Sequence, residues 1–313
     1  MLSWNQRVHL SLQLMRSSFL VIWRNPKLSL YPAIIFVSAV VAVFFFLTPV
    51  YLIPTGHALG SDEHVQAAFL RLITPFSKGP LPLSERTAAF SYLALIYLGS
   101  MFLATFFNVA FHHEIMKALA GQSVSLRRGF AAAVERLPAI FWWSMFAGTI
   151  GLLLSLLGNR LHGLARWLIR GVGMVWSMAS IFVIPALIRN REANPLQLVR
   201  LSGATLKRTW GESVTAYLGV TLGSAVGLLA LIAAIVSGFL LGQLTGLKLL
   251  MALPLLGGLL CVIAFFYYST TLNCVLRCAL YIYASEGEVP VPFTAEQLDA
   301  AWKIKKFPQS DRA

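Results

Sequence analysis

The side chains able to do chemistry in this chain are a few polar groups set in long apolar runs. Asn108 lies inside one run with His112 and His113 at its end, and Asn273 and Arg277 lie late in the last run. Polar groups at membrane depth are costly, so they are candidates for proton relays, ion paths or substrate contacts. The simpler alternative is structural: an interhelical hydrogen bond for Asn108, and contact with Arg277 or with anionic lipid for the histidine pair.

These residues match no catalytic motif. The string His112-His113-Glu114 is not followed by the further histidine that a zinc-protease helix needs. The chain has no Gly-x-Ser-x-Gly elbow and no phosphate-cradling glycine loop. No carboxylate lies inside an expected span to act as a general base. The sequence therefore predicts a non-enzymatic protein without a cofactor.

A polar loop at 54–87 contains the one cluster that resembles metal ligands. Its members are two histidines and two acids: His57, Asp62, Glu63 and His64. Their spacing matches no specific metal motif, so no metal site is predicted. The three cysteines, Cys261, Cys274 and Cys278, all fall in the last apolar region, which argues against a disulfide framework.

Arginine pairs eight residues apart occur three times, each before an apolar run. The pairs are Arg16 and Arg24, Arg128 and Arg136, and Arg200 and Arg208. Internal repetition of this kind points to a repeated structural unit. We interpret the chain as three copies of a basic surface helix followed by a hydrophobic hairpin, with units at 5–113, 123–188 and 194–283.

The composition is that of a membrane protein. Of 313 residues, 58% are hydrophobic and 12% are charged, whereas soluble domains carry about 25% charged residues. Runs of about 20 apolar residues can cross the hydrocarbon core as helices. Spans are predicted at 28–53, 88–113, 139–157, 167–188, 213–241 and 247–283. The fold class expected is thus all-α, a polytopic bundle of six transmembrane helices.

Basic residues fix the expected orientation. Seventeen Lys and Arg residues lie on the side that holds both termini and the three basic segments, and seven lie on the other side. The positive-inside rule puts the first side in the cytoplasm, including the tail at 284–313, and leaves the 54–87 loop outside. The net charge of +13 is then explained by anionic lipid as a partner rather than by nucleic acid.

The three basic segments share a helical phase. Opposite the first arginine of each lie Leu14, Ser18, Val21 and Ile22; Leu126, Phe130, Ala133 and Val134; and Leu198, Ser202, Thr205 and Leu206. This spacing is typical of an amphipathic helix, which we expect to lie flat in the membrane interface. The alternative is ordinary cytoplasmic loops.

A glycine ladder occupies the fifth predicted span. Gly219, Gly223 and Gly227 recur every fourth residue, which allows another helix to approach closely. The partner helix is expected within this chain; another membrane protein or a second copy is the alternative.

Several strings resemble a known family: FFNVA at 106–110, GTIG at 148–151, FVIP at 182–185, RTWGE at 208–212, RCALYIYA at 277–284 and GEVP at 287–290. They resemble an uncharacterised bacterial family of six-span inner-membrane proteins with only a domain-of-unknown-function label. The architecture is more loosely similar to the membrane domain attached to some glycerophosphodiester phosphodiesterases. The resemblance implies a six-span fold in a bacterial inner membrane and no particular activity. The long outer loop of the first copy departs from it.

Two functions are compatible with these features. The first is a scaffold or anionic-lipid-binding protein whose cytoplasmic arginine ring, formed by Arg128, Arg136, Arg200, Lys207 and Arg208, holds head groups. The alternative is a transporter or lipid-translocating channel with a path between the hairpins. A cavity lined by Asn108, His112 and Asn273 would favour the alternative.

Overall fold

The structure is a computed structural model that describes residues 4–73, 83–209, 229, 232–233, 235–240, 243 and 248–301. Every regular element in these ranges is a helix. The helices are α1 (Trp4–Arg24), η1 (Pro26–Ser29), α2 (Leu30–Leu52), α3 (Asp62–Ile73), α4 (Leu83–Leu119), α5 (Leu126–Val134), α6 (Leu137–Arg160), α7 (Leu164–Ala179), α8 (Val183–Arg189), α9 (Pro195–Thr209), α11 (Lys248–Glu286) and α12 (Ala295–Ala301).

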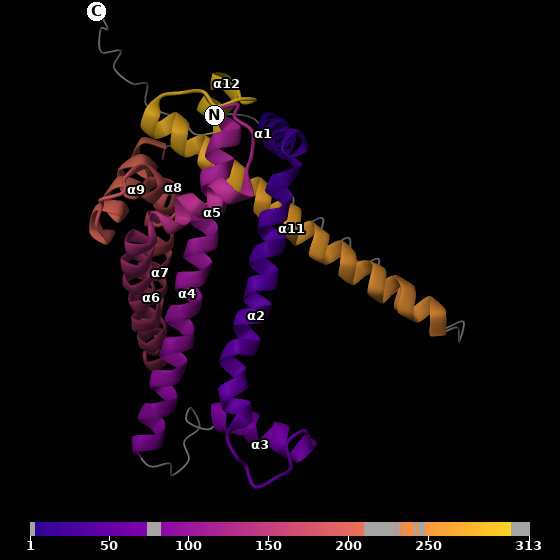
Figure 1. Cartoon of the computed structure of the whole chain (residues 1–313). Coiled ribbons are helices and arrows are strands. Elements are labelled where there is room, and N and C mark those ends of the chain that lie inside the picture. The colour runs from indigo at the N-terminus through magenta and orange to yellow at the C-terminus, as the bar shows by residue number, and fades with distance from the viewer. Residues whose placement is uncertain are drawn as a thin grey trace, which may run out of the picture.

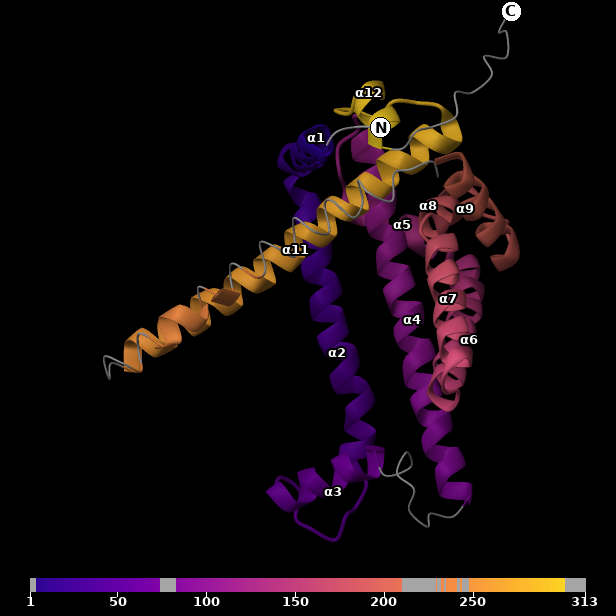
Figure 2. The same cartoon turned by 180° about the vertical axis from the view of Figure 1, so that it is seen from behind.

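Helices α2, α4, α6 and α7 lie with their axes roughly parallel (Figures 1 and 2). Helices α1, α5, α8, α9 and α12 gather at one end of them, together with the C-terminal part of α11. We call this the basic end, because the three predicted basic segments form its helices α1, α5 and α9. Helix α3 lies at the opposite end.

Four described helices are long and apolar enough to cross a membrane. They cover Pro26–Leu52, Arg86–Leu119, Leu137–Gly158 and Leu164–Arg189, so each of the first four predicted spans coincides with a helix that could cross a membrane. Helix α2 exposes Val41, Phe44 and Phe45, as expected for a helix in contact with lipid rather than water. Most of the fifth predicted span, including its glycines Gly219, Gly223 and Gly227, lies outside the described residues, so six spans and three equivalent units stay a prediction.

The fourth span differs from the prediction because it is not one continuous helix. Helix α7 ends at Ala179 and α8 begins at Val183, with a turn between them. Pro185 lacks an N–H, so it cannot continue the hydrogen-bond ladder of α7. At the turn the Phe182 N–H donates instead to Ser202 Oγ at 3.0 Å, which ties the break to α9.

Helix α11 is continuous from Lys248 to Glu286. It runs past the end of the sixth predicted span at 283 and is not interrupted at Pro254. From Thr271 to Ala284 this helix is buried on most sides, with Val275, Cys278 and Ala279 fully covered. Its last turns are therefore the core around which the basic end is packed.

The amphipathic phase predicted for the basic helices is confirmed for α1 and α9, but protein covers their apolar faces. All four predicted residues of α1 and all four of α9 are buried, including Leu14 and Leu198. Helix α1 packs on α11 and α12, and α9 packs on α6, α7, α8 and α11. On α5, Ala133 is buried while Val134 is 54% exposed. Protein therefore covers the apolar faces of α1 and α9, and the expectation that these helices lie flat in the membrane interface stays a prediction.

Close packing between α2, α4 and α5 depends on one glycine. A Cβ added to Gly129 would lie 2.0 Å from the Tyr31 hydroxyl oxygen, 2.9 Å from Glu114 Cγ and 3.0 Å from the Ala110 carbonyl oxygen. The Tyr31 hydroxyl is buried and has no hydrogen-bond partner in the structure. Tyr31 stacks on Phe111 of α4 instead, with ring centroids 5.3 Å apart.

Gly129→Ala is expected to lower stability by about 1–3 kcal/mol, as overpacked cores do. Gly203→Ala on α9 is the matched control, because its Cβ would meet nothing within 4 Å. That variant should gain about 0.5–1 kcal/mol from the better helix propensity of alanine. Thermal melting of the purified protein in detergent measures both, and equal melting temperatures for the two variants would contradict the packing account.

Candidate functional site

A buried acid joins α4 to α5 at the basic end. The Glu114 side chain is fully buried and accepts two hydrogen bonds from Arg128, at 2.8 Å from Nε and 2.7 Å from Nη2. The Ser125 N–H donates to the same carboxylate at 2.7 Å, and His113 Nδ1 lies 3.2 Å away. These bonds to Glu114 raise the pKa of Arg128 above its usual value. Arg128, the first member of the predicted ring, is therefore engaged within the protein.

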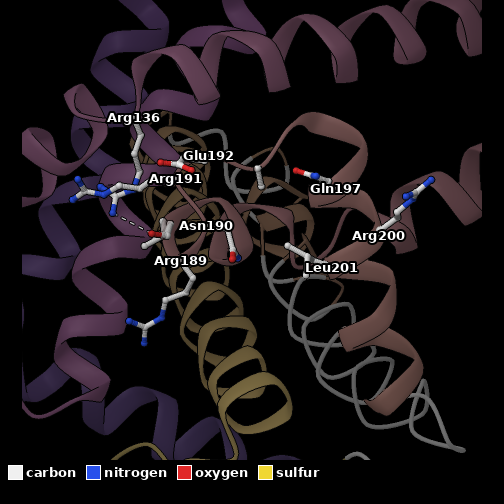
Figure 3. Close-up of a pocket in the computed structure, with 10 residues that line it drawn as sticks. Arg136, Arg189, Asn190, Arg191, Glu192, Gln197, Arg200 and Leu201 are labelled. Carbon is white, nitrogen blue, oxygen red and sulfur yellow. Dashed lines mark hydrogen bonds between the residues drawn. The ribbon is translucent and has the colours of Figure 1, made fainter.

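The second feature is a basic cleft of about 870 Å³ where the α5–α6 junction meets α8 and α9 (Figure 3). We call it the arginine cleft. It is lined by four arginines, one acid and five uncharged residues: Arg136, Arg189, Arg191, Arg200, Glu192, Ile188, Asn190, Ala193, Gln197 and Leu201. The volume is within the range of small-ligand sites.

Arg136 is the buried member of the arginine cleft. It is 7% exposed, and its Nη1 and Nη2 donate to the carbonyls of Ala132 and Ile188 at 2.8 and 3.0 Å. Its Nε is buried without a hydrogen-bond partner. Burial, and then the neighbouring charge of Arg191, lower the pKa of Arg136. An anion reaching this side chain would therefore gain a desolvated cation as its partner.

Three arginines of the cleft form ion pairs, among them Arg136, whose Nη1 lies 3.9 Å from Glu135 Oε2. Arg191 Nη2 contacts Glu135 Oε2 at 2.7 Å. Arg189 contacts both carboxylate oxygens of Glu286, at 2.7 and 2.9 Å. Arg200 is exposed and forms no ion pair with a described residue. In Figure 3 Arg136 and Arg191 lie together on one side of the cleft, and Arg200 lies on the other.

The remaining members of the predicted ring lie outside this cleft. Lys207 is exposed near the end of α9, and only the backbone of Arg208 is described. The structure thus brings Arg136 and Arg200 together and separates Arg128, which binds Glu114. Sequence reasoning missed the acids Glu114, Glu135 and Glu286. The position of Glu114 directly after the histidine pair was the one available signal.

The polar residues predicted at membrane depth make local contacts. Asn108 Nδ2 donates to the Ala104 carbonyl at 2.8 Å, and His112 Nδ1 donates to the Asn108 carbonyl at 2.8 Å. His112 is buried, and Arg277 of α11 is near enough to interact with it electrostatically. Asn273 Oδ1 is buried without a hydrogen-bond partner. None of these residues lines the arginine cleft.

A separate apolar groove of about 320 Å³ lies between α2 and α4. Small side chains form part of both walls, with Ser38 and Ala42 on α2 and Ser100 and Ala104 on α4. Asn108 and His112 are not among the residues that line it. The groove therefore lacks the polar lining expected of a transport path at that depth.

Hydrogen bonds of His64 hold the histidine-containing loop against the end of α2. His64 is buried, and its ring nitrogens lie 2.7 Å from Thr55 Oγ1 and 2.7 Å from the Tyr51 carbonyl oxygen. Among the described residues there is no group of three or more His, Cys, Asp or Glu side chains that could hold a metal ion.

Comparison with known proteins identifies the family and nothing more specific. A model described as "Family of unknown function (DUF6159)" matches residues 87–291, about two thirds of the chain. The chain belongs to this family, which confirms the resemblance to proteins with a domain-of-unknown-function label. Neither a curated protein nor a solved structure matches the chain.

Arg128→Gln is expected to destabilise the protein by about 3 kcal/mol, because it leaves the Glu114 carboxylate buried without its cation. Arg127→Gln, on the exposed neighbouring residue, should change stability by less than about 0.5 kcal/mol. The double variant Glu114→Gln/Arg128→Gln should recover part of the loss, since it removes the unpaired charge. Melting temperatures in detergent test all three variants. An Arg128→Gln variant with the wild-type melting temperature would contradict a stabilising buried ion pair between Glu114 and Arg128.

Proposed function

We propose that this member of the DUF6159 family is a non-enzymatic membrane protein that binds anionic lipid head groups at its basic end. The observation that carries the proposal is the arginine cleft, in which four arginines and one acid surround a volume of about 870 Å³. Guanidinium groups suit phosphate because their planar array of donors can bind two oxygens at once. No activity on the bound lipid is included in the proposal.

The position of the arginine cleft along the chain supports a head-group ligand. Arg136 immediately precedes the candidate span Leu137–Gly158, and Arg189 is the last residue of the candidate span Leu164–Arg189. Both side chains therefore start where spanning helices leave the hydrocarbon core. Each basic residue near an anionic membrane surface contributes roughly 1 kcal/mol of attraction, so a few of them are enough to set a lipid preference.

Helix α1 supports the same placement of the basic end. Its exposed residues Phe19 and Trp23 stack with ring centroids 6.0 Å apart, and Trp23 lies less than one helical turn before the candidate span that begins at Pro26. Aromatic rings are enriched at the membrane–water interface. Arg16 and Arg24, which are also exposed, would meet the phosphates at that level.

The positive-inside rule completes the proposal. It places the basic end in the cytoplasm, both termini with it, and α3 outside. Together with the bacterial family that the sequence resembles, this gives a multipass protein of the bacterial inner membrane. Another membrane protein or a second copy of the chain is a further candidate partner.

The second candidate function is a transporter or lipid-translocating channel. The groove between α2 and α4, open along two spanning helices and lined mainly by apolar side chains, favours it as a route for an acyl chain. The binding function is preferred because Asn108 and His112 line neither the arginine cleft nor the groove between α2 and α4. A water-filled path in a spanning bundle needs polar groups of that kind.

Arg200→Gln/Lys207→Gln is expected to reduce the anionic lipid that co-purifies with the protein several-fold, because about 1 kcal/mol of attraction is lost per charge. Both side chains are exposed, so folding should be unaffected. Mass spectrometry of extracted lipids gives the ratio of phosphatidylglycerol to phosphatidylethanolamine.

The matched control is Arg160→Gln/Arg170→Gln, which removes the same charge from exposed residues of α6 and α7. This control should keep the wild-type lipid ratio. An unchanged ratio in the Arg200/Lys207 variant, or an equal decrease in both variants, would reject a head-group site at the basic end.

A further inference from the structure

We propose that a phosphate-bearing anion in the arginine cleft competes with Glu286 for Arg189 and thereby releases the segment 287–299 from the basic end. This inference rests on the proposed function and adds a form of regulation to it. Opening of this segment would then depend on whether an anion occupies the arginine cleft.

The contact that would be exchanged joins the ends of two helices. Arg189 is the last residue of α8 and Glu286 is the last residue of α11. Two parallel hydrogen bonds, Nε to Oε1 at 2.7 Å and Nη2 to Oε2 at 2.9 Å, connect residues 97 positions apart. The side chains are 47% and 26% exposed, so the pair is accessible to solvent and contributes little net stability. An external anion can therefore replace the carboxylate.

Phosphate presents the same pair of acceptor oxygens as the carboxylate of Glu286. Arg189 lines the arginine cleft while Glu286 does not, so an anion bound in the cleft would offer this guanidinium a second acceptor. Its negative charge would also repel Glu286, because like charges near one site oppose each other. Both effects favour separation of the two helix ends.

The segment after Glu286 is attached to the rest of the basic end at several points, one of them the hydrogen bond from the Tyr283 hydroxyl to Asp299 Oδ1 at 2.6 Å. The chain turns at Gly287, where φ is +73°, and returns across the basic end to α12, next to α1 (Figure 1). The Val291 N–H donates to the Leu119 carbonyl at 3.1 Å, and Ser17 Oγ donates to Gln297 Oε1 at 3.2 Å. Phe293 and Leu298 are buried. Loss of the Glu286 anchor at its start would increase opening of this segment.

The test uses the full chain in detergent with three titrants: phosphatidylglycerol, phosphatidylcholine and inorganic phosphate. Native mass spectrometry measures lipid binding, and hydrogen exchange measures protection of 287–299. The variants are Glu286→Gln and, as the matched control, Glu288→Gln. Glu288 is exposed and two residues along the chain, so the two variants have the same net charge.

In wild type, phosphatidylglycerol should bind in preference to phosphatidylcholine and accelerate exchange in 287–299. Glu286→Gln should bind phosphatidylglycerol about two- to five-fold more tightly, as expected for removal of an exposed competing carboxylate. Its segment should exchange up to about five-fold faster than in wild type before lipid is added, which is the limit set by losing one exposed ion pair. Glu288→Gln should behave as wild type. If inorganic phosphate alone reproduces the wild-type response, competition is supported and soluble phosphate is the source of the anion.

Two results would overturn the inference while the proposed function survives. One is preferential binding of phosphatidylglycerol with unchanged exchange in 287–299. The other is equal affinity for this lipid in Glu286→Gln and Glu288→Gln. Equal binding of phosphatidylglycerol and phosphatidylcholine to wild type would instead reject the proposed function, and the competition with it.

Discussion

The carboxylate of Glu114 must be neutralised where no water reaches it, and the arrangement around it follows from that requirement. Arg128 supplies two of its hydrogen bonds and the Ser125 N–H supplies another. Both donors belong to the start of α5, so satisfying the acid also fixes α5 against the end of α4. Gly129 then comes next to Tyr31, which positions the start of α2. One buried charge thus links three parts of the bundle, since leaving it unpaired is strongly unfavourable.

The rest of the basic end is built on the end of α11. Its last turns are covered by α1, α4 and α9, so the apolar faces of α1 and α9 are buried in contacts inside the protein. The exposed side of these helices carries Arg16 and Arg200. Cations therefore remain at the surface while apolar side chains form a core, and the arginine cleft is one place where this surface is concave.

Much of this architecture could be predicted from hydropathy and helical periodicity. Four spans were found because runs of apolar residues are long enough to cross a bilayer, and the phases of α1 and α9 were found because their buried residues recur every three to four positions. Periodicity shows which face is apolar, but it cannot show whether protein or lipid covers that face. Spacing also grouped Arg128 with Arg136 and Arg200, but it could not show that Arg128 pairs with an acid 14 residues away in sequence. The break before α8 required the contact between Phe182 and Ser202, which links residues distant in sequence.

The burial of two thiols in α11 has a practical consequence. Cys274 is 7% exposed and Cys278 is fully covered, both in the part of α11 that holds the basic end together. A maleimide reagent can reach either sulfur only when that core opens. The rate of alkylation at these two positions, resolved by peptide mass, therefore follows the opening of the core of the basic end without any engineered label.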